Sequence, residues 1–203
     1  MNNEKDCISR ADLIAAYKYF SHNLRTSTAT IVAMLEAVND DLGDDAEEML
    51  EIVAESGFLL DTFDRGMSSC FRFLLEDKVD AADDDIDVKR LVDHYLDKTK
   101  FSTHPDQADI EIDVEDDFHI RTCGYVFKTL FMMVLSEAVA NAKGKLIIKG
   151  EPPVLSLSCG QGFNELPVVF SIFTNMFERG GTRFSYTSDE ISMRFDNENF
   201  DCR

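Results

Sequence analysis

Residues 20–28 read Phe-Ser-His-Asn-Leu-Arg-Thr-Ser-Thr and lie in the middle of a long amphipathic segment. At about 100° per residue, His22 lies roughly 200° from both Phe20 and Leu24, so we expect its imidazole on the solvent-exposed face. The apolar positions of the segment follow one another in steps of three and four, interrupted only at Ser27, which predicts one helical stripe of coiled-coil type. These positions are Leu13, Tyr17, Phe20, Leu24, Ile31, Met34 and Val38.

The expected neighbours of His22 on this outer face are Lys18, one turn before it, and Arg25 and Thr26, one turn after it. Two cations and a hydroxyl beside an exposed imidazole suit a phosphoryl group, which carries about two negative charges. The pattern therefore predicts that His22 carries phosphate. An ordinary surface histidine is the alternative that this geometry alone leaves open.

Composition and charge narrow the classes of function. The chain has 203 residues, 44% of them hydrophobic and 16 of them Phe, which is ample for a core in one large or two small domains. Its formal charge of -19 argues against nucleic acid, because phosphate backbones are bound by clustered Lys and Arg. The same charge opposes binding to an anionic membrane surface, and we expect neither partner.

Cysteine and histidine spacing predicts no metal site. The five cysteines are odd in number and form no C-x-x-C pair, so we expect reduced thiols. His94, His104 and His119 each lack a second ligand at metal spacing, and surface or packing roles are expected for them. A polar N-terminus and the absence of a long apolar run favour a cytoplasmic protein.

Two helices are expected first. Ser9 followed by Asp12 has the pattern of an N-cap with an acidic first turn, opening a helix over residues 10–38. The acidic stretch 39–45 favours a helix-helix turn over a calcium loop, because Leu50 stands where a calcium loop needs Glu. A second helix is predicted over 46–75. Two such helices cannot enclose a core alone, so we expect dimerisation of the hairpin into a four-helix bundle with a His22 on each side.

Beyond the hairpin the pattern changes to mixed α and β. The acidic run 76–87 is interpreted as a solvated linker, which divides the chain into residues 1–78 and 79–203. Strands are predicted at 110–114, 118–121, 145–149, 154–158, 183–187 and 190–195, and helices at 88–98, 123–142 and 168–178. The segment 118–121 is expected to pair with 110–114. The order predicts an α/β sandwich with helices on one face of a mixed sheet, and hence an α+β fold for the whole chain.

Residues 20–27 resemble the phosphoacceptor box of sensor histidine kinases, whose pattern is F-S-H-E/D-L-R-T-P. Six of the eight positions match. Asn23 replaces the acidic residue that acts as the base for autophosphorylation in the family, and an amide cannot accept a proton near neutral pH. Ser27 replaces the proline that kinks the helix. The resemblance implies an intact acceptor histidine without the kinase's base.

The second domain resembles the ATP-binding domain of the same kinases in order and length. Glu137 and Asn141, four residues apart on one helical face, look like the family's N-box. Ser158-Cys159-Gly160-Gln161-Gly162 stands where the family has D-x-G-x-G, but without the adenine-reading Asp. Only residues 163–167 separate it from the next helix, which leaves no phosphate-binding lid. Glu137, Asn141, Gly160 and Gly162 are therefore expected to be vestigial.

This combination resembles the dimeric histidine phosphotransferases, in which a kinase-like bundle is followed by a degenerate domain that binds no nucleotide. The resemblance implies a phosphorelay protein that passes a phosphoryl group between response-regulator receiver domains through His22. It implies supporting roles for Lys18, Asn23, Arg25 and Thr26, no cofactor on this chain, and magnesium on the partner receiver. Two alternatives stay open: a divergent histidine kinase, and a non-catalytic protein that binds or inhibits a kinase or receiver.

Overall fold

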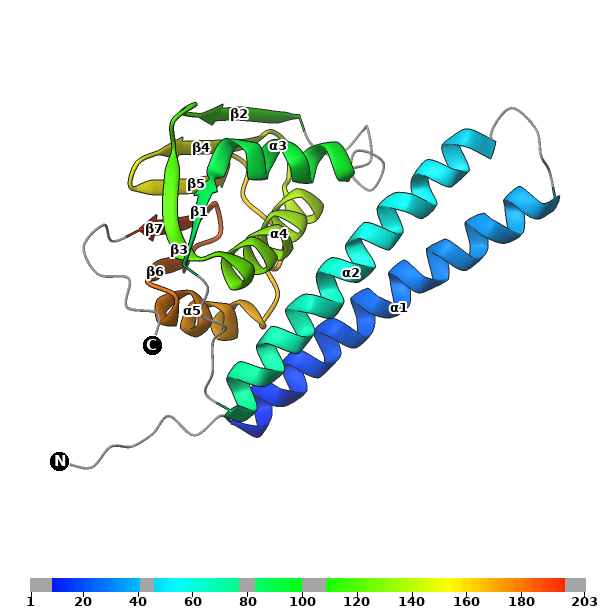
Figure 1. Ribbon diagram of the computed structural model, residues 1–203, viewed down its shortest axis with the longest axis horizontal. Coiled ribbons are helices and arrows are strands. Elements are labelled where there is room, and N and C mark those ends of the chain that lie inside the picture. Colours follow the sequence, from blue (N-terminus) through cyan, green and yellow to red (C-terminus); the bar gives the residue numbers. More distant parts are fainter. Residues whose placement is uncertain (1–8, 41–45, 77–82, 100–108, 196–203) are drawn as a thin grey trace.

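The computed structural model describes residues 9–40, 46–76, 83–99 and 109–195 (Figure 1). It begins with a hairpin of two helices of 31 residues each, α1 (Arg10–Asp40) and α2 (Ala46–Glu76). The Ser9 hydroxyl accepts from the Asp12 amide at 3.1 Å, and the Asp12 carboxylate accepts from the Ser9 amide at 3.2 Å. This reciprocal capping box explains why α1 begins where the sequence predicted. The sequence predicts a turn rather than a calcium loop over residues 39–45. Residues 39 and 40 belong to α1, and residues 41–45 lie outside the described residues.

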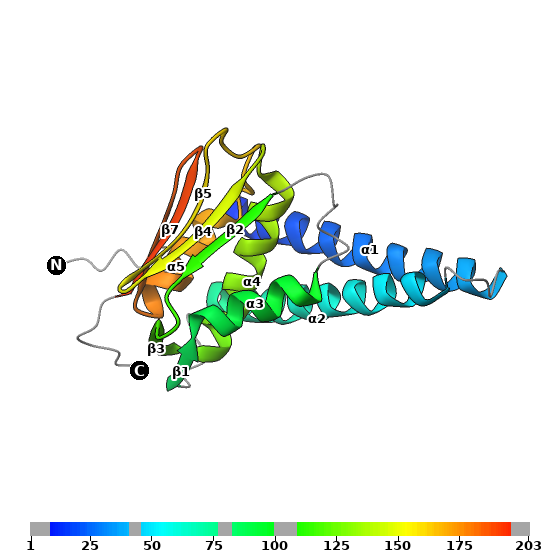
Figure 2. The same ribbon diagram turned by 90° about the horizontal axis from the view of Figure 1, so that it is seen from above.

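The remainder of the chain folds into a sheet with helices on one face, as Figure 2 shows. The main sheet has the strand order β2-β4-β5-β7-β6, with β2 parallel to β4 and the other pairs antiparallel; β1 and β3 form a separate antiparallel pair. The elements are β1 (Asp83–Asp87), α3 (Val88–Lys98), β2 (Ile110–Val114), β3 (His119–Cys123), α4 (Gly124–Asn141), β4 (Leu146–Glu151), β5 (Val154–Cys159), α5 (Phe170–Arg179), β6 (Thr182–Tyr186) and β7 (Glu190–Phe195). The predicted fold class, a helical hairpin followed by an α/β sandwich, is confirmed.

Two predictions of local structure were wrong. The acidic run 83–87 is the strand β1 rather than part of a solvated linker, and β3 pairs with β1 instead of with β2. In the β1–β3 register Ile86 lies opposite Ile120, and both are buried. Burial of this pair outweighs the poor strand propensity of the aspartates around it. The proposed boundary between residues 78 and 79 lies outside the described residues.

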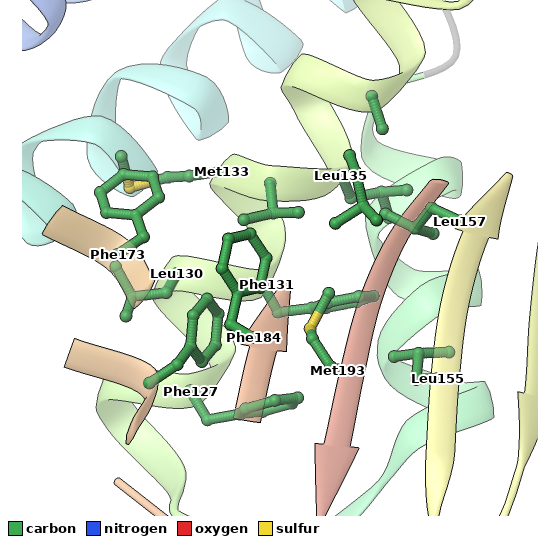
Figure 3. Packing of buried hydrophobic residues seen from close by; sticks show 14 of the residues in the cluster. Phe127, Leu130, Phe131, Met133, Leu135, Leu155, Leu157, Phe173, Phe184 and Met193 are labelled. Atoms are coloured by element: carbon green, nitrogen blue, oxygen red, sulfur yellow. The ribbon is translucent and has the colours of Figure 1, made fainter. Parts of the chain in front are cut away.

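Helix α4 occupies the centre of the molecule, between the sheet and the hairpin (Figures 1 and 3). Its residues Leu130, Phe131, Val134 and Leu135 are completely buried. Figure 3 shows Leu130, Phe131 and Leu135 among side chains of β5, β6 and β7. A helix covered on several sides needs apolar residues all round, which explains why 124–141 shows no polar face. None of the helices that the structure describes is long and apolar enough to cross a membrane.

Helix α2 of the hairpin packs very closely against α4. A Cβ atom added at Gly66 of α2 would lie 2.2 Å from Met133 Sδ, so any larger residue here would force the Met133 side chain to move. Phe20 of α1 is completely buried beside it, and Tyr19 meets Phe173 of α5 edge to face at a ring distance of 6.1 Å. The hairpin and the second domain thus share one hydrophobic core.

The buried stripe of α1 differs in one position from the predicted one. Phe20 and Ser27 are buried as predicted, but Tyr17 is 64% exposed and Ala16 is completely buried in its place. The stripe shifts because α1 faces both α2 and the neighbouring second domain, whereas the prediction placed one narrow coiled-coil seam along it.

The close contact at Gly66 yields a stability prediction with an internal control. We expect Gly66→Ala to lower the free energy of unfolding by about 1–2 kcal/mol, because the new methyl group overpacks against Met133. Gly57→Ala, also in α2, meets no atom within 4 Å and should raise stability by about 0.5–1 kcal/mol through helix propensity. Urea unfolding of both variants measures the difference. Equal stabilisation of both would contradict the described packing of α2 on α4.

Candidate functional site

Helix α1 presents three faces with different surroundings. Ala16, Phe20 and Ser27 lie on the buried face against α2. His22 is exposed, as the helical spacing predicted, and lies on a second face that borders a cleft. The third face carries apolar residues that remain exposed, namely Ile14, Tyr17, Val32 and Leu35. The helix stays continuous through Ser27, the position of the family's proline.

The cleft has a volume of about 850 Å³ and lies where the hairpin meets α4. Its walls come from α1, from α2, from α4 and from Pro167 in the segment before α5. Lys18, His22 and Thr26 are half-buried or exposed along α1, whereas Phe63 and Ser56 of α2 are buried. The lining from α1 is Lys18, Tyr19, His22, Asn23, Thr26, Ser27 and Thr30; that from α2 is Ile52, Glu55, Ser56, Leu59 and Phe63; that from α4 is Ser136, Glu137 and Ala140.

Four of the five predicted acceptor-site residues lie in this cleft. Lys18, His22, Asn23 and Thr26 line it together, whereas Arg25 lines a separate groove with Leu24, Thr28, Ala29, Val32 and Ala33. Thr26 Oγ1 donates to the His22 carbonyl oxygen at 3.0 Å, and Asn23 Nδ2 donates to the Tyr19 carbonyl oxygen at 3.0 Å. These bonds hold both side chains against the helix. Thr26 keeps its hydroxyl lone pairs available beside His22.

Glu137 brings a carboxylate from α4 into the same cleft. Burial raises the pKa of Glu137 above the ordinary glutamate range, although the nearby Tyr19 hydroxyl and the hydrogen bond from Asn141 oppose the shift. Burial, followed by the charge of Glu137, raises the pKa of Tyr19 well above its usual value. The two groups face each other, but no hydrogen bond of normal geometry joins them, and the Tyr19 hydroxyl is buried without a partner.

Sequence reasoning missed Tyr19, Glu55 and Ser56 as parts of this site. Glu55 and Ser56 are both buried in α2 on the side that faces the cleft. One feature of the sequence could have indicated Ser56. The apolar residues of the second helix recur in steps of three and four, and Ser56 stands where this spacing predicts a hydrophobic residue.

Two of the residues that resemble nucleotide-binding positions, Glu137 and Asn141, are hydrogen-bonded to each other. Asn141 Nδ2 donates to the Glu137 carbonyl oxygen at 2.9 Å and to Glu137 Oε2 at 3.2 Å. Gly160 is exposed, and Gly162 adopts φ +80°, where an added Cβ would lie 2.9 Å from the Ser188 carbonyl oxygen. Gly162 therefore serves a tight turn against the β6–β7 connection.

Three backbone amides that follow β5 donate hydrogen bonds to carbonyl oxygens of the protein itself. The amide of Gly162 donates to Cys159 at 2.8 Å, that of Phe163 to Ser188 at 2.7 Å and that of Asn164 to Asn141 at 2.7 Å. A phosphate-binding loop needs amides of this kind free to point at the ligand. These three amides are therefore not available to a phosphate group.

The other histidines occupy packing and surface positions. His94 meets the Phe58 ring edge to face at 5.9 Å, and His119 Nδ1 lies 3.3 Å from Asp85 Oδ1. His104 lies outside the described residues. Within the ranges that the structure describes, no three His, Cys, Asp or Glu side chains converge as a metal site.

The raised pKa of Glu137 predicts a pH-dependent stability difference. The folded state retains the Glu137 proton at pH values where the unfolded state has already lost it, above about pH 4.3. The contribution of Glu137 to stability is fully present below that pH. It is lost as the pH rises through the pKa that Glu137 has in the folded state. We therefore expect the unfolding free energy of the wild type, minus that of Glu137→Gln, to fall as pH rises from acid to neutral. Urea titrations at several pH values measure it, and a constant or rising difference would contradict the burial.

No protein-family model matches this sequence, and no curated protein sequence matches it either. Solved structures do resemble it. The histidine kinase AdeS of Acinetobacter baumannii aligns with a TM-score of 0.58 and 11% identity, over 88% of this chain and 98% of that one. The cytoplasmic segment of histidine kinase QseC aligns with a TM-score of 0.53 and 11% identity, over 66% of this chain and 93% of that one. At this identity the likeness concerns the fold: the chain has a histidine-kinase-like arrangement of a helical hairpin and an α/β domain.

Proposed function

We propose that this protein is a histidine phosphotransferase of two-component signalling, which relays a phosphoryl group between response-regulator receiver domains through His22. The observation that carries the proposal is the exposed imidazole of His22 at the rim of an open cleft, on the first helix of a histidine-kinase-like fold. Lys18 and Thr26 lie in the same lining. A cation and a hydroxyl next to the acceptor suit a transferring phosphoryl group.

The proposed chemistry needs no base on this chain. A neutral imidazole has one ring nitrogen with a free lone pair. That nitrogen attacks the phosphorus of the receiver's aspartyl phosphate, a P–N bond forms as the P–O bond breaks, and the receiver carboxylate leaves. The reverse step delivers the phosphoryl group to a second receiver. Asn23 in place of an acidic residue is compatible with this reaction, since no hydroxyl or water must be deprotonated.

We propose that the second domain supports the hairpin and binds no nucleotide. The support is the closed turn after β5, where the amides of residues 162, 163 and 164 all donate to protein carbonyl oxygens. Glu137 and Asn141 are bonded to each other, and Glu137 lines the cleft beside α1. The magnesium that such transfers require is then supplied by the receiver domain.

We also propose that two copies associate through the exposed apolar face of α1. Contiguous apolar surface on a protein commonly marks an interaction site. Leu24, Ala29, Val32 and Ala33 line a shallow groove along this face, and Ile14, Tyr17 and Leu35 extend the face in both directions. Pairing of two such faces produces a four-helix bundle with the two His22 side chains on its outside.

The relay is tested with labelled phosphate from two sources. The purified protein is incubated either with labelled ATP or with labelled, phosphorylated receiver domains encoded in the same genome. We expect label from a receiver and none from ATP, and we expect His22→Gln to abolish the labelling. His119→Gln serves as the matched control, because His119 is also exposed but lies on β3.

The other outcomes each contradict the proposal in a different way. Label from ATP at His22 would identify a divergent kinase. Absence of label from both sources, with receiver binding intact in His22→Gln, would support the non-catalytic binding protein. Label that persists in His22→Gln but disappears in His119→Gln would place the acceptor elsewhere.

The proposed dimer is tested by charging its face. Val32 is 48% exposed in α1, and Val32→Glu should raise the dimer dissociation constant by about 100-fold or more, because a carboxylate would be buried without a partner. Val168→Glu is the matched control, since Val168 is 70% exposed outside the hairpin. Sedimentation velocity over a range of concentrations measures both. A monomeric wild type, or equal weakening by both changes, would overturn the proposal.

A further inference from the structure

The inner part of the cleft has a composition distinct from its rim. The rim carries Lys18 and His22, whereas the inner walls combine the apolar side chains of Ile52, Leu59 and Phe63 with polar groups from three helices. Apolar walls with a few convergent polar groups are typical of sites for small organic molecules. A volume of about 850 Å³ falls in the range of such sites.

One polar group in this region lacks a partner. The Tyr19 hydroxyl is buried, faces the Glu137 carboxyl group and forms no hydrogen bond of normal geometry. Buried hydroxyl groups are nearly always hydrogen-bonded, because leaving one unsatisfied is costly. The unsatisfied hydroxyl therefore points to a ligand that completes its bonding in the cleft.

The charges of the inner walls select the chemistry of that ligand. Glu137 is largely buried, and within the described part of the chain its carboxylate accepts a hydrogen bond from Asn141. Glu55, which already interacts with neighbouring groups, is buried in the opposite wall and adds negative potential. A group that donates several hydrogen bonds and carries positive charge would satisfy Glu137 and the Tyr19 oxygen together. A metal ion is disfavoured, because the described residues bring no three metal-binding side chains together here.

We propose that this cleft binds a small organic cation, with a primary ammonium group between Glu137 and Tyr19 and an apolar body against Ile52, Leu59 and Phe63. An ammonium group has three donors and no acceptor, which matches a carboxylate and a phenol oxygen on adjacent sides. The hydrophobic body supplies binding energy by leaving water. The proposal is independent of whether His22 carries phosphate, since it requires binding alone.

The test uses matched probes that differ in charge. Benzylamine, 2-phenylethylamine and 4-phenylbutylamine are titrated into the full chain, alongside the alcohols and carboxylic acids with the same carbon skeletons. Protein-observed NMR shifts measure the dissociation constants. We expect at least one amine to bind about tenfold or more tightly than its alcohol and its acid, with shifts centred on α1, α2 and α4 around the cleft.

Three variants separate the site from general electrostatics. Glu137→Gln keeps the shape of the side chain and should weaken the amine about tenfold or more while leaving the alcohol unchanged. Tyr19→Phe should weaken the amine about threefold or more. Glu165→Gln, which removes an exposed charge outside the cleft lining, should change nothing. Amines that bind no better than their alcohols, no binding by any probe, or equal weakening by Glu137→Gln and Glu165→Gln would overturn the proposal.

Discussion

The structure depends on the close contact between α2 and α4 at Gly66 and Met133. A side chain larger than hydrogen at position 66 would overlap the Met133 sulfur as it is placed here, so glycine at this position lets α2 pack closely on the Met133 side chain of α4. Phe20, Phe63 and Phe173 complete the apolar contact around it and join the hairpin to the second domain in one core. Without this contact, each long helix would leave a broad apolar surface in water.

The same contact creates the cleft. The α1–α2 hairpin touches the second domain around Gly66, while Pro167 and the end of α4 near Ala140 remain apart from α1 and leave the space between them. His22 lies at the rim of this space and is exposed, whereas Tyr19, three residues earlier, is half-buried and places its enclosed hydroxyl beside Glu137. One helix therefore presents a solvent-facing imidazole and an enclosed phenol within a single turn.

The second domain has a histidine-kinase-like fold, and the residues that resemble nucleotide-binding positions form internal hydrogen bonds. Asn141 binds Glu137, and the turn through Gly162 is bonded to residues of α4 and of the β6–β7 connection. These hydrogen bonds satisfy backbone amides of the turn. In a phosphate-binding loop, amides of this kind point at the ligand instead. The burial of Phe163 adds an apolar contact that stabilises the same turn.

The sequence by itself determined the elements whose stability is local. The Ser9–Asp12 capping box and the three-four spacing of apolar residues define α1, and the same helical geometry placed His22 outside the seam. Strand 110–114 followed from its alternation. Only the tertiary structure decided that β3 pairs with β1, that the aspartate run 83–87 forms a strand, and that Glu137 faces Tyr19. These features depend on residues that are distant in the chain, and their mutual burial outweighs the local preference for helix, strand or turn. No local sequence pattern specifies which distant surfaces will pack together.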